Sequence, residues 1–273
     1  MYQAVGISVS FGNILLLFKK LCCRMGFKFH RNKYERMENK MKRIVSMMLV
    51  VLLTLSMMAG CGGKKENAPT QTTEPVQTTA PVQEDRPLSL GVVEGNRYTS
   101  EYAGLVCELP DDWTLMSAEE AQDLAGIVGE MYEGTEVGDA IEDGQQFYDM
   151  VAMSGDMMMN MNIIIQKMSA SERVAYMKLS EDEIAQMVQD QKDLLAEAYA
   201  SAGMNLQTME KVTVTYLGEE HSAIKTKMDV QGITCYQLQL YSYHLGEYAV
   251  IITLTSNESD NIDSMLEMFS AVE

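Results

Sequence analysis

The chain has 273 residues, of which 39 are acidic, 21 are Lys or Arg and 3 are His, so its formal net charge is −18. Residues 1–60 hold 10 of the basic and 2 of the acidic side chains, which leaves residues 61–273 with 11 basic, 37 acidic and a net charge of −26. Nucleic-acid binding needs a basic footprint, and electrostatic adhesion to anionic lipids needs basic clusters, so this composition argues against both.

Residues 1–40 do not read as part of a folded domain. They are basic, contain the adjacent Cys22 and Cys23, and have a single short apolar run at Ile14–Phe18. We interpret them as a mis-assigned N-terminal extension, with translation starting at Met41 or Met37. A genuine basic cytoplasmic extension is the alternative.

Residues 41–60 have the organisation of a signal peptide. Lys42 and Arg43 precede an uncharged apolar run, Ile44–Met58, of about 15 residues, which is the length of a signal-peptide core. A membrane-spanning helix needs ~20. The run ends in Met58-Ala59-Gly60-Cys61, which resembles the lipobox of bacterial lipoproteins. The resemblance implies cleavage before Cys61, lipid attachment (palmitate) at Cys61, and a position on the extracytoplasmic face of the cell membrane. The alternative is a cysteine that merely follows an apolar run.

The segment after Cys61 is predicted to be a disordered tether. Residues 62–87 contain four of the five prolines, the near-repeat TTEPVQ and TTAPVQ, and no large apolar side chain except valine. A chain of this composition cannot bury a core. If it were fully polyproline-like, it would reach about 80 Å. Residues 88–273 then form a single globular domain.

Strands and helices alternate along this domain. A hairpin is expected at Tyr98–Leu109 around Gly104, and Pro110–Asp112 forms a turn before Trp113. Two capping boxes, Ser117–Glu120 and Ser180–Glu183, each predict a helix start. Further elements are expected at 147–154 and 157–166 (a hairpin), 209–217, 222–230, 234–243 and 247–255 (strands) and Ile262–Phe269 (a helix).

The four C-terminal strands alternate in polarity, which predicts an antiparallel α+β sheet flanked by helices. One face is apolar and is expected to lie beneath helices. The other is mixed, and tyrosines beside polar groups are typical contact residues. We therefore take it as the candidate binding face, unless a second helix layer covers it. Its residues are Lys225, Lys227, Gln237, Gln239, Tyr241 and Tyr243.

The order of elements, together with Leu109-Pro110-Asp111-Asp112-Trp113, resembles the PsbP-like family. This resemblance covers nearly all of 97–273. It implies an α/β/α sandwich, an antiparallel sheet between helices. Members include photosystem accessory subunits, a Ran-binding import factor and small bacterial lipoproteins. The family acts by binding, so the resemblance implies no catalytic residues.

Candidate chemistry is sparse in the sequence. His221 and His244 fall in expected turns, and two further cysteines, Cys107 and Cys235, either form a disulfide or stay reduced and buried. The methionines of 150–168 suit Cu(I) in principle, but Met157, Met159 and Met161 share a strand face that is expected to be buried. The acidic loop with Glu136, Asp139, Glu142 and Asp143 lacks the spacing of an EF-hand calcium loop.

We therefore predict no catalytic residue, no metal site and no cofactor. The predicted function is that of a lipid-anchored binding or accessory module of an envelope complex. Its partner would be a protein, a glycan or a small ligand. An envelope hydrolase and a metal-binding lipoprotein are the alternatives.

Overall fold

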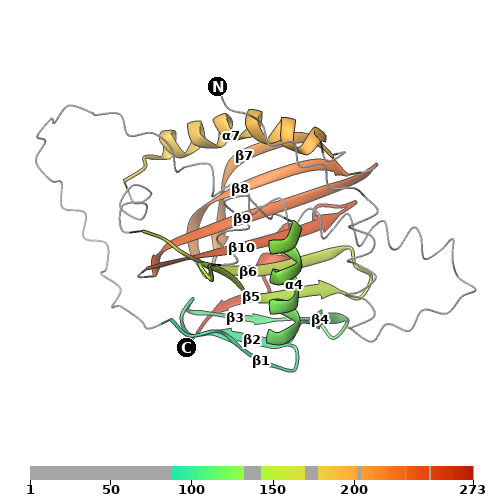
Figure 1. The fold of residues 1–273 in the computed structure, drawn as a ribbon, viewed down its shortest axis with the longest axis vertical. Coiled ribbons are helices and arrows are strands. Elements are labelled where there is room, and N and C mark those ends of the chain that lie inside the picture. The colour runs from blue at the N-terminus through green and yellow to red at the C-terminus, as the bar shows by residue number, and fades with distance from the viewer. Residues whose placement is uncertain are drawn as a thin grey trace, which may run out of the picture.

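A computed structural model describes residues 88–131, 143–169, 178–201, 204–230, 232–245 and 247–272. The predicted signal peptide, Cys61 and the tether lie outside these ranges. Two antiparallel sheets and three helices make up the described part (Figure 1). No helix in this part is long and apolar enough to cross a membrane.

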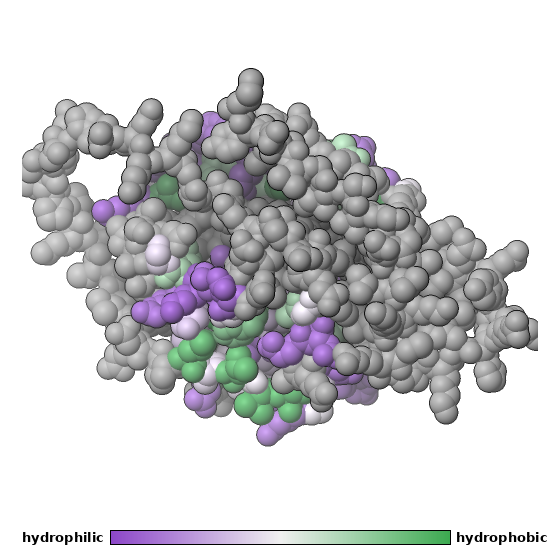
Figure 2. Space-filling view, viewed as in Figure 1, coloured by the Kyte–Doolittle hydropathy of each residue, from purple (hydrophilic) through white to green (hydrophobic). Residues whose placement is uncertain are grey.

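The smaller sheet has four short strands in the order β1-β2-β3-β11. They are β1 (Val92–Glu94), β2 (Arg97–Ser100), β3 (Leu105–Glu108) and β11 (Phe269–Ala271). The hairpin of β2 and β3 confirms the predicted turn around Gly104, whose φ of 69° is one that glycine adopts without strain. Four exposed apolar side chains, Leu88, Leu90, Val92 and Val93, lie at and before β1. Hydrophobic residues gather at the lower end of the view in Figure 2, where Figure 1 places β1.

The larger sheet has seven strands in the order β4-β5-β6-β10-β9-β8-β7. Its elements are β4 (Trp113–Leu115), β5 (Gln146–Ser154), β6 (Met159–Lys167), β7 (Met204–Tyr216), β8 (Glu219–Val230), β9 (Ile233–Leu245) and β10 (Tyr248–Asn257). Every pairing is antiparallel, as predicted. Some strands extend beyond the predicted bounds, such as β7, which begins at Met204 instead of 209, whereas β6 begins later than predicted, at Met159 instead of 157.

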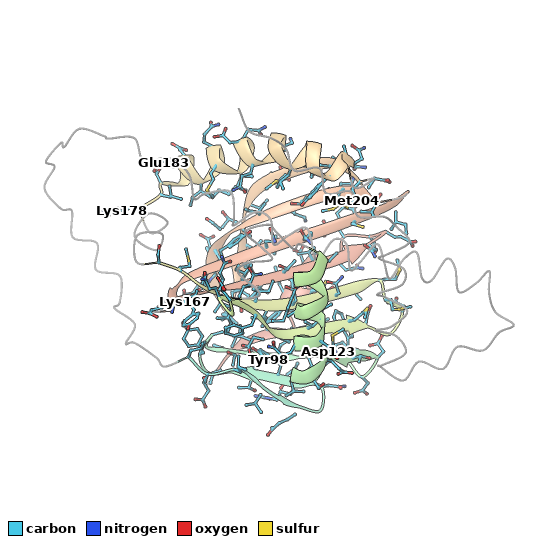
Figure 3. All side chains as sticks on the ribbon, in the orientation of Figure 1. Tyr98, Asp123, Lys167, Lys178, Glu183 and Met204 are labelled. Atoms are coloured by element: carbon cyan, nitrogen blue, oxygen red, sulfur yellow. The ribbon has the colours of Figure 1, made fainter. Side chains whose placement is uncertain are left out.

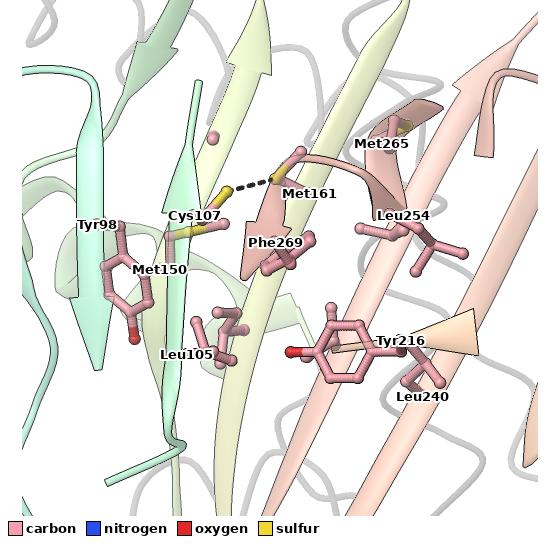
Figure 4. Close-up of a cluster of buried hydrophobic side chains, with 14 of the residues drawn as sticks. Tyr98, Leu105, Cys107, Met150, Met161, Tyr216, Leu240, Leu254, Met265 and Phe269 are labelled. Carbon is pink, nitrogen blue, oxygen red and sulfur yellow. Dashed lines mark hydrogen bonds between the residues drawn. The ribbon is translucent and has the colours of Figure 1, made fainter. Parts of the chain in front are cut away.

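One apolar cluster joins the two sheets. Tyr98, Leu105 and Cys107 of the small sheet meet Met161 and Leu254 of the large one, and all five are at most 1% exposed (Figure 4). The expectation that helices cover the apolar face is confirmed only in part. The small sheet and the five-residue helix α8 (Ile262–Leu266) cover the apolar side chains of β9 and β10. The apolar side chains of β8, such as Ile224 and Met228, lie on the other face, in the cluster that contains Val188 and Leu195 of the helix Glu181–Ser201.

Two longer helices lie on the opposite face of the large sheet. Helix α4 (Ala118–Met131) packs on β5, and α7 (Glu181–Ser201) packs on β7 (Figure 1). Both capping boxes are confirmed. At the start of α7 (Figure 3), the Glu183 carboxylate accepts hydrogen bonds from the Ser180 backbone N–H and hydroxyl, both at 2.7 Å. Ser117 and Glu120 repeat this arrangement before α4.

The C-terminal element differs from the prediction. The helix ends at Leu266, and Phe269 lies in β11, paired with Cys107. Phe269 is 7% exposed and fills the space between the sheets. A partner strand and an apolar pocket therefore override the local helical periodicity.

Candidate functional site

The six residues of the predicted binding face do not lie on one face. Residues directly opposite each other in an antiparallel pair project from the same side. Lys225 is opposite Leu238 and Lys227 is opposite Tyr236, so both lysines lie on the side of the inter-sheet core. Gln237 and Gln239 are opposite Thr226 and Ile224, on the helix side. The prediction of a shared face is therefore wrong. The polar side chains of β8 and those of β9 project from opposite sides of the sheet.

The lysines make local contacts at the border of the core. The Lys225 Nζ lies 2.6 Å from an Asp260 carboxylate oxygen, with the side chains 31% and 35% exposed. The Lys227 Nζ lies 5.5 Å from the centre of the Tyr236 ring. Tyr243 belongs to β9, but its side chain lies outside the described part.

On the helix side, polar side chains run across the centre of the large sheet. Strand register places them in two rows of three, with β10 in the middle. One row is Asn162, Thr253 and Gln239; the other is Asn160, Thr255 and Gln237. We call these six residues the polar belt. Each is at most 5% exposed.

The polar belt is only partly hydrogen-bonded by protein groups. The Gln237 Nε2 donates to the Thr255 Oγ1 at 3.2 Å, and the Tyr241 hydroxyl, next to the belt, donates to the Gln239 Oε1 at 3.0 Å. Within the described part, no hydrogen-bond partner is found for the Asn162 side chain, the Thr253 hydroxyl or the Gln237 Oε1. Buried polar groups in folded proteins almost always have partners, so these atoms are expected to pair with groups outside the described part, such as water or a ligand.

The chemistry of the polar belt is that of recognition. Amides and hydroxyls offer donors and acceptors without charge. They suit an uncharged ligand rich in hydroxyl or amide groups. Of the six residues, only Gln237 and Gln239 belong to the predicted binding face. The period-two spacing of Asn160 with Asn162 and of Thr253 with Thr255 was the available signal, in strands otherwise rich in isoleucine.

A second polar group connects the two sheets. The Tyr98 hydroxyl donates to one carboxylate oxygen of Asp149, and the Gly91 N–H donates to the other at 2.8 Å. Burial, the largest influence, raises the pKa of Asp149, although both hydrogen bonds oppose the rise. A Cβ at Gly91 would lie 2.2 Å from the Tyr98 ring. These contacts therefore hold the segment that precedes β1 against the large sheet.

The cysteine alternatives are resolved by the fold. Cys107 and Cys235 are both free and buried. They cannot form a disulfide because Cys107 belongs to the core between the sheets and Cys235 to the cluster beneath α7. Burial raises the pKa of both thiols to about 12.

The histidines and the acidic residues that were weighed as metal ligands form no cluster in the described part. Within it, no group of three or more His, Cys, Asp or Glu side chains is placed to hold a metal ion. His221 lies in β8 rather than in a turn, and its ring is 5.5 Å from that of Tyr216. Glu136, Asp139 and Glu142 and the side chain of His244 lie outside the described part, and Asp143 is exposed.

No protein-family model and no curated protein matches the chain. Among solved structures, it is similar to cyanobacterial PsbP (CyanoP) from Synechocystis sp. PCC 6803. The identity is 11% and the TM-score 0.37, over 68% of this chain and 98% of that one. A structure from Bacteroides thetaiotaomicron VPI-5482 is similar at 12% identity and a TM-score of 0.32, over 66% of this chain and 50% of that one. At these TM-scores, the similarities carry no argument about function.

Proposed function

We propose that this protein is a lipid-anchored extracytoplasmic lipoprotein whose PsbP-like domain is a non-enzymatic binding or accessory module of an envelope complex. The anchor is the lipidated Cys61, and residues 62–87 hold the domain away from the membrane. Support for the location comes from the signal peptide at 41–60 and its lipobox. The net charge of −26 for residues 61–273 keeps such a domain soluble.

The polar belt is the observation that supports a binding role. A buried donor or acceptor that stays unpaired in the free protein costs roughly 1–3 kcal/mol. A ligand that pairs with them recovers this cost. All six side chains are buried, so a ligand reaches them only after a local opening of the fold. The ligand chemistry that fits is uncharged and rich in hydroxyl or amide groups, such as an envelope glycan.

The accessory role is tested by cross-linking in cells followed by mass spectrometry. The chain is expressed from Met41, with Cys61→Ala as the unanchored control. We expect one membrane complex to be recovered with the wild-type chain and lost with Cys61→Ala. A membrane-bound protein that enriches no partner would overturn the accessory role.

Ligand binding at the polar belt is tested by thermal shift with envelope glycans. A ligand at 100 times its Kd stabilises a protein by about 2.7 kcal/mol. We expect Asn162→Leu to abolish the shift without lowering the melting temperature of the free protein, because the Asn162 amide has no protein partner in the described part. Asn205→Leu, at an exposed position of β7, is the matched control. A shift retained in Asn162→Leu would exclude the belt as the site.

A further inference from the structure

The two sheets leave an open side between β7 and β11. Among the described strands, β7 pairs with β8 alone and β11 with β3 alone, so each is the last strand of its sheet. A groove of about 730 Å³ lies between them, lined by residues of both strands and of α8. Val214, Leu266 and Phe269 are apolar residues of its lining.

The outward-facing backbone groups of β7 belong to residues that line this groove. Leu217 and Gly218 form the two-residue turn to β8, with φ of 51° and 83°. This is the type I′ arrangement, in which the flanking residues form a hydrogen-bonded pair. Tyr216 and Val214 therefore bond to β8, because bonded pairs alternate along an antiparallel ladder. The N–H and C=O groups of Thr213 and Thr215 point away from β8, and both residues line the groove.

The outward-facing backbone groups of β11 also belong to residues that line the groove. The Glu108 N–H donates to the Met268 C=O at 3.0 Å, and the Val272 N–H donates to the Gly104 C=O at 3.1 Å. Ser270 lies midway between these two bonds, so it is the β11 residue that bonds to β3. Phe269 and Ala271 present their N–H and C=O groups to the other side, and both line the groove. Two free strand edges thus have their outward-facing residues in one groove.

The charged side chains lining the groove are Asp263 and Glu267, both acidic and exposed. Glu219 and Glu220, at the nearby hairpin, are exposed as well. A strand in the groove presents alternate side chains to opposite sides. One set would meet the apolar lining residues and the other would face the acidic side chains.

We propose that the groove between β7 and β11 binds an extended, basic segment of a partner protein by strand addition, a recurring mode of peptide recognition. The partner alternates basic with apolar side chains. This inference goes beyond the ligand site at the polar belt and rests on the proposed function only for the compartment in which the partner is met.

The test uses the lipidated protein in detergent and a labelled peptide that alternates lysine with valine, followed by fluorescence anisotropy. We expect saturable binding that weakens with salt. Two control peptides bind at least tenfold more weakly: one with alternate backbone nitrogens methylated, which cannot add to a strand edge, and one with glutamate for lysine. If the methylated peptide binds as tightly as the lysine–valine peptide, strand addition is overturned. If the glutamate peptide does so, the basic partner is overturned.

The protein side is tested with Thr215→Pro. Proline is tolerated on an edge strand where the N–H faces outward, so β7 and β8 stay paired while the groove loses one donor. We expect peptide affinity to fall about tenfold, as the loss of a hydrogen bond implies, with an unchanged circular dichroism spectrum. Thr215→Val, which keeps the N–H, is the matched control. Should Thr215→Pro fail to fold, the double variant Asp263→Asn with Glu267→Gln must weaken binding severalfold without any change in the backbone.

Amide hydrogen exchange gives a position-specific result. The peptide should slow exchange at Thr213, Thr215 and Ala271, and leave Val214 and Ser270 at their already slow rates. Slow exchange at Thr213, Thr215 and Ala271 without peptide would mean that a segment of this chain occupies the groove. Concentration-dependent dimerisation would mean that a second copy of the chain occupies it. Either result overturns the proposal. Loss of the membrane complex in cells with intact peptide binding would instead count against the proposed function.

Discussion

Two threonines on β10 offer a matched test of the polar belt. Thr253 and Thr255 lie on one strand, face the same side and are both 0% exposed. The Thr255 Oγ1 accepts a hydrogen bond from Gln237 at 3.2 Å, whereas no partner is found for the Thr253 Oγ1 within the described part. Valine has nearly the shape of threonine and the same preference for strands. The substitution to valine therefore isolates the hydroxyl.

The two substitutions should have opposite effects on stability. Thr253→Val removes a buried hydroxyl for which the described residues offer no partner. Burying an unpaired hydroxyl costs roughly 1–3 kcal/mol, so we expect the free energy of unfolding to rise by about that amount. Thr255→Val removes a hydrogen bond worth about 0.5–1.5 kcal/mol and leaves the Gln237 amide unpaired. We expect it to lower the free energy of unfolding by about 1–3 kcal/mol.

Urea denaturation followed by circular dichroism measures both changes as shifts of the midpoint at constant slope. If the free energy of unfolding rises in Thr253→Val and falls in Thr255→Val, the Thr253 hydroxyl is unpaired in the free protein, as the ligand site requires. Equal destabilisation by Thr253→Val and Thr255→Val would mean that the Thr253 hydroxyl is paired, and the reasoning behind the ligand site would be refuted.

Three other predictions concern the start of helix α7 and the buried ionisable side chains. Ser180→Ala removes the cap of α7 and should cost about 1 kcal/mol in the same urea assay, whereas Ser180→Thr should cost less. Burial raises the pKa of Asp149, so its contribution to stability is fully present below the unfolded value of about 3.9 and is lost as the pH rises through the folded-state value. Asp149→Asn should therefore flatten this part of the stability–pH curve, and an unchanged curve would contradict the assignment. Because burial raises the pKa of Cys107 and Cys235 to about 12, neither thiol should react with a maleimide at pH 8 until urea unfolds the protein, and rapid labelling of the native protein would disprove their burial.

Local sequence patterns determined most of the secondary structure. The boxes at Ser117 and Ser180 predicted both helix starts, since a capping box depends only on residues three apart. The hairpin around Gly104 and the meander from β7 to β10 followed from turn residues and period-two alternation. These signals are local, and the antiparallel α+β class follows from their order along the chain.

The tertiary structure alone decided which face each strand presents and what covers it. Lys225 and Gln237 were assigned to one surface because both are polar, yet the register of β8 with β9 sends them to opposite sides. The polar belt depends on the pairing of β6, β10 and β9, and β6 precedes β10 by about 80 residues in the chain. Phe269 became a strand residue because β3, far away in sequence, supplied a partner and a pocket. Register and layer packing are non-local, so no pattern within a single strand reveals them.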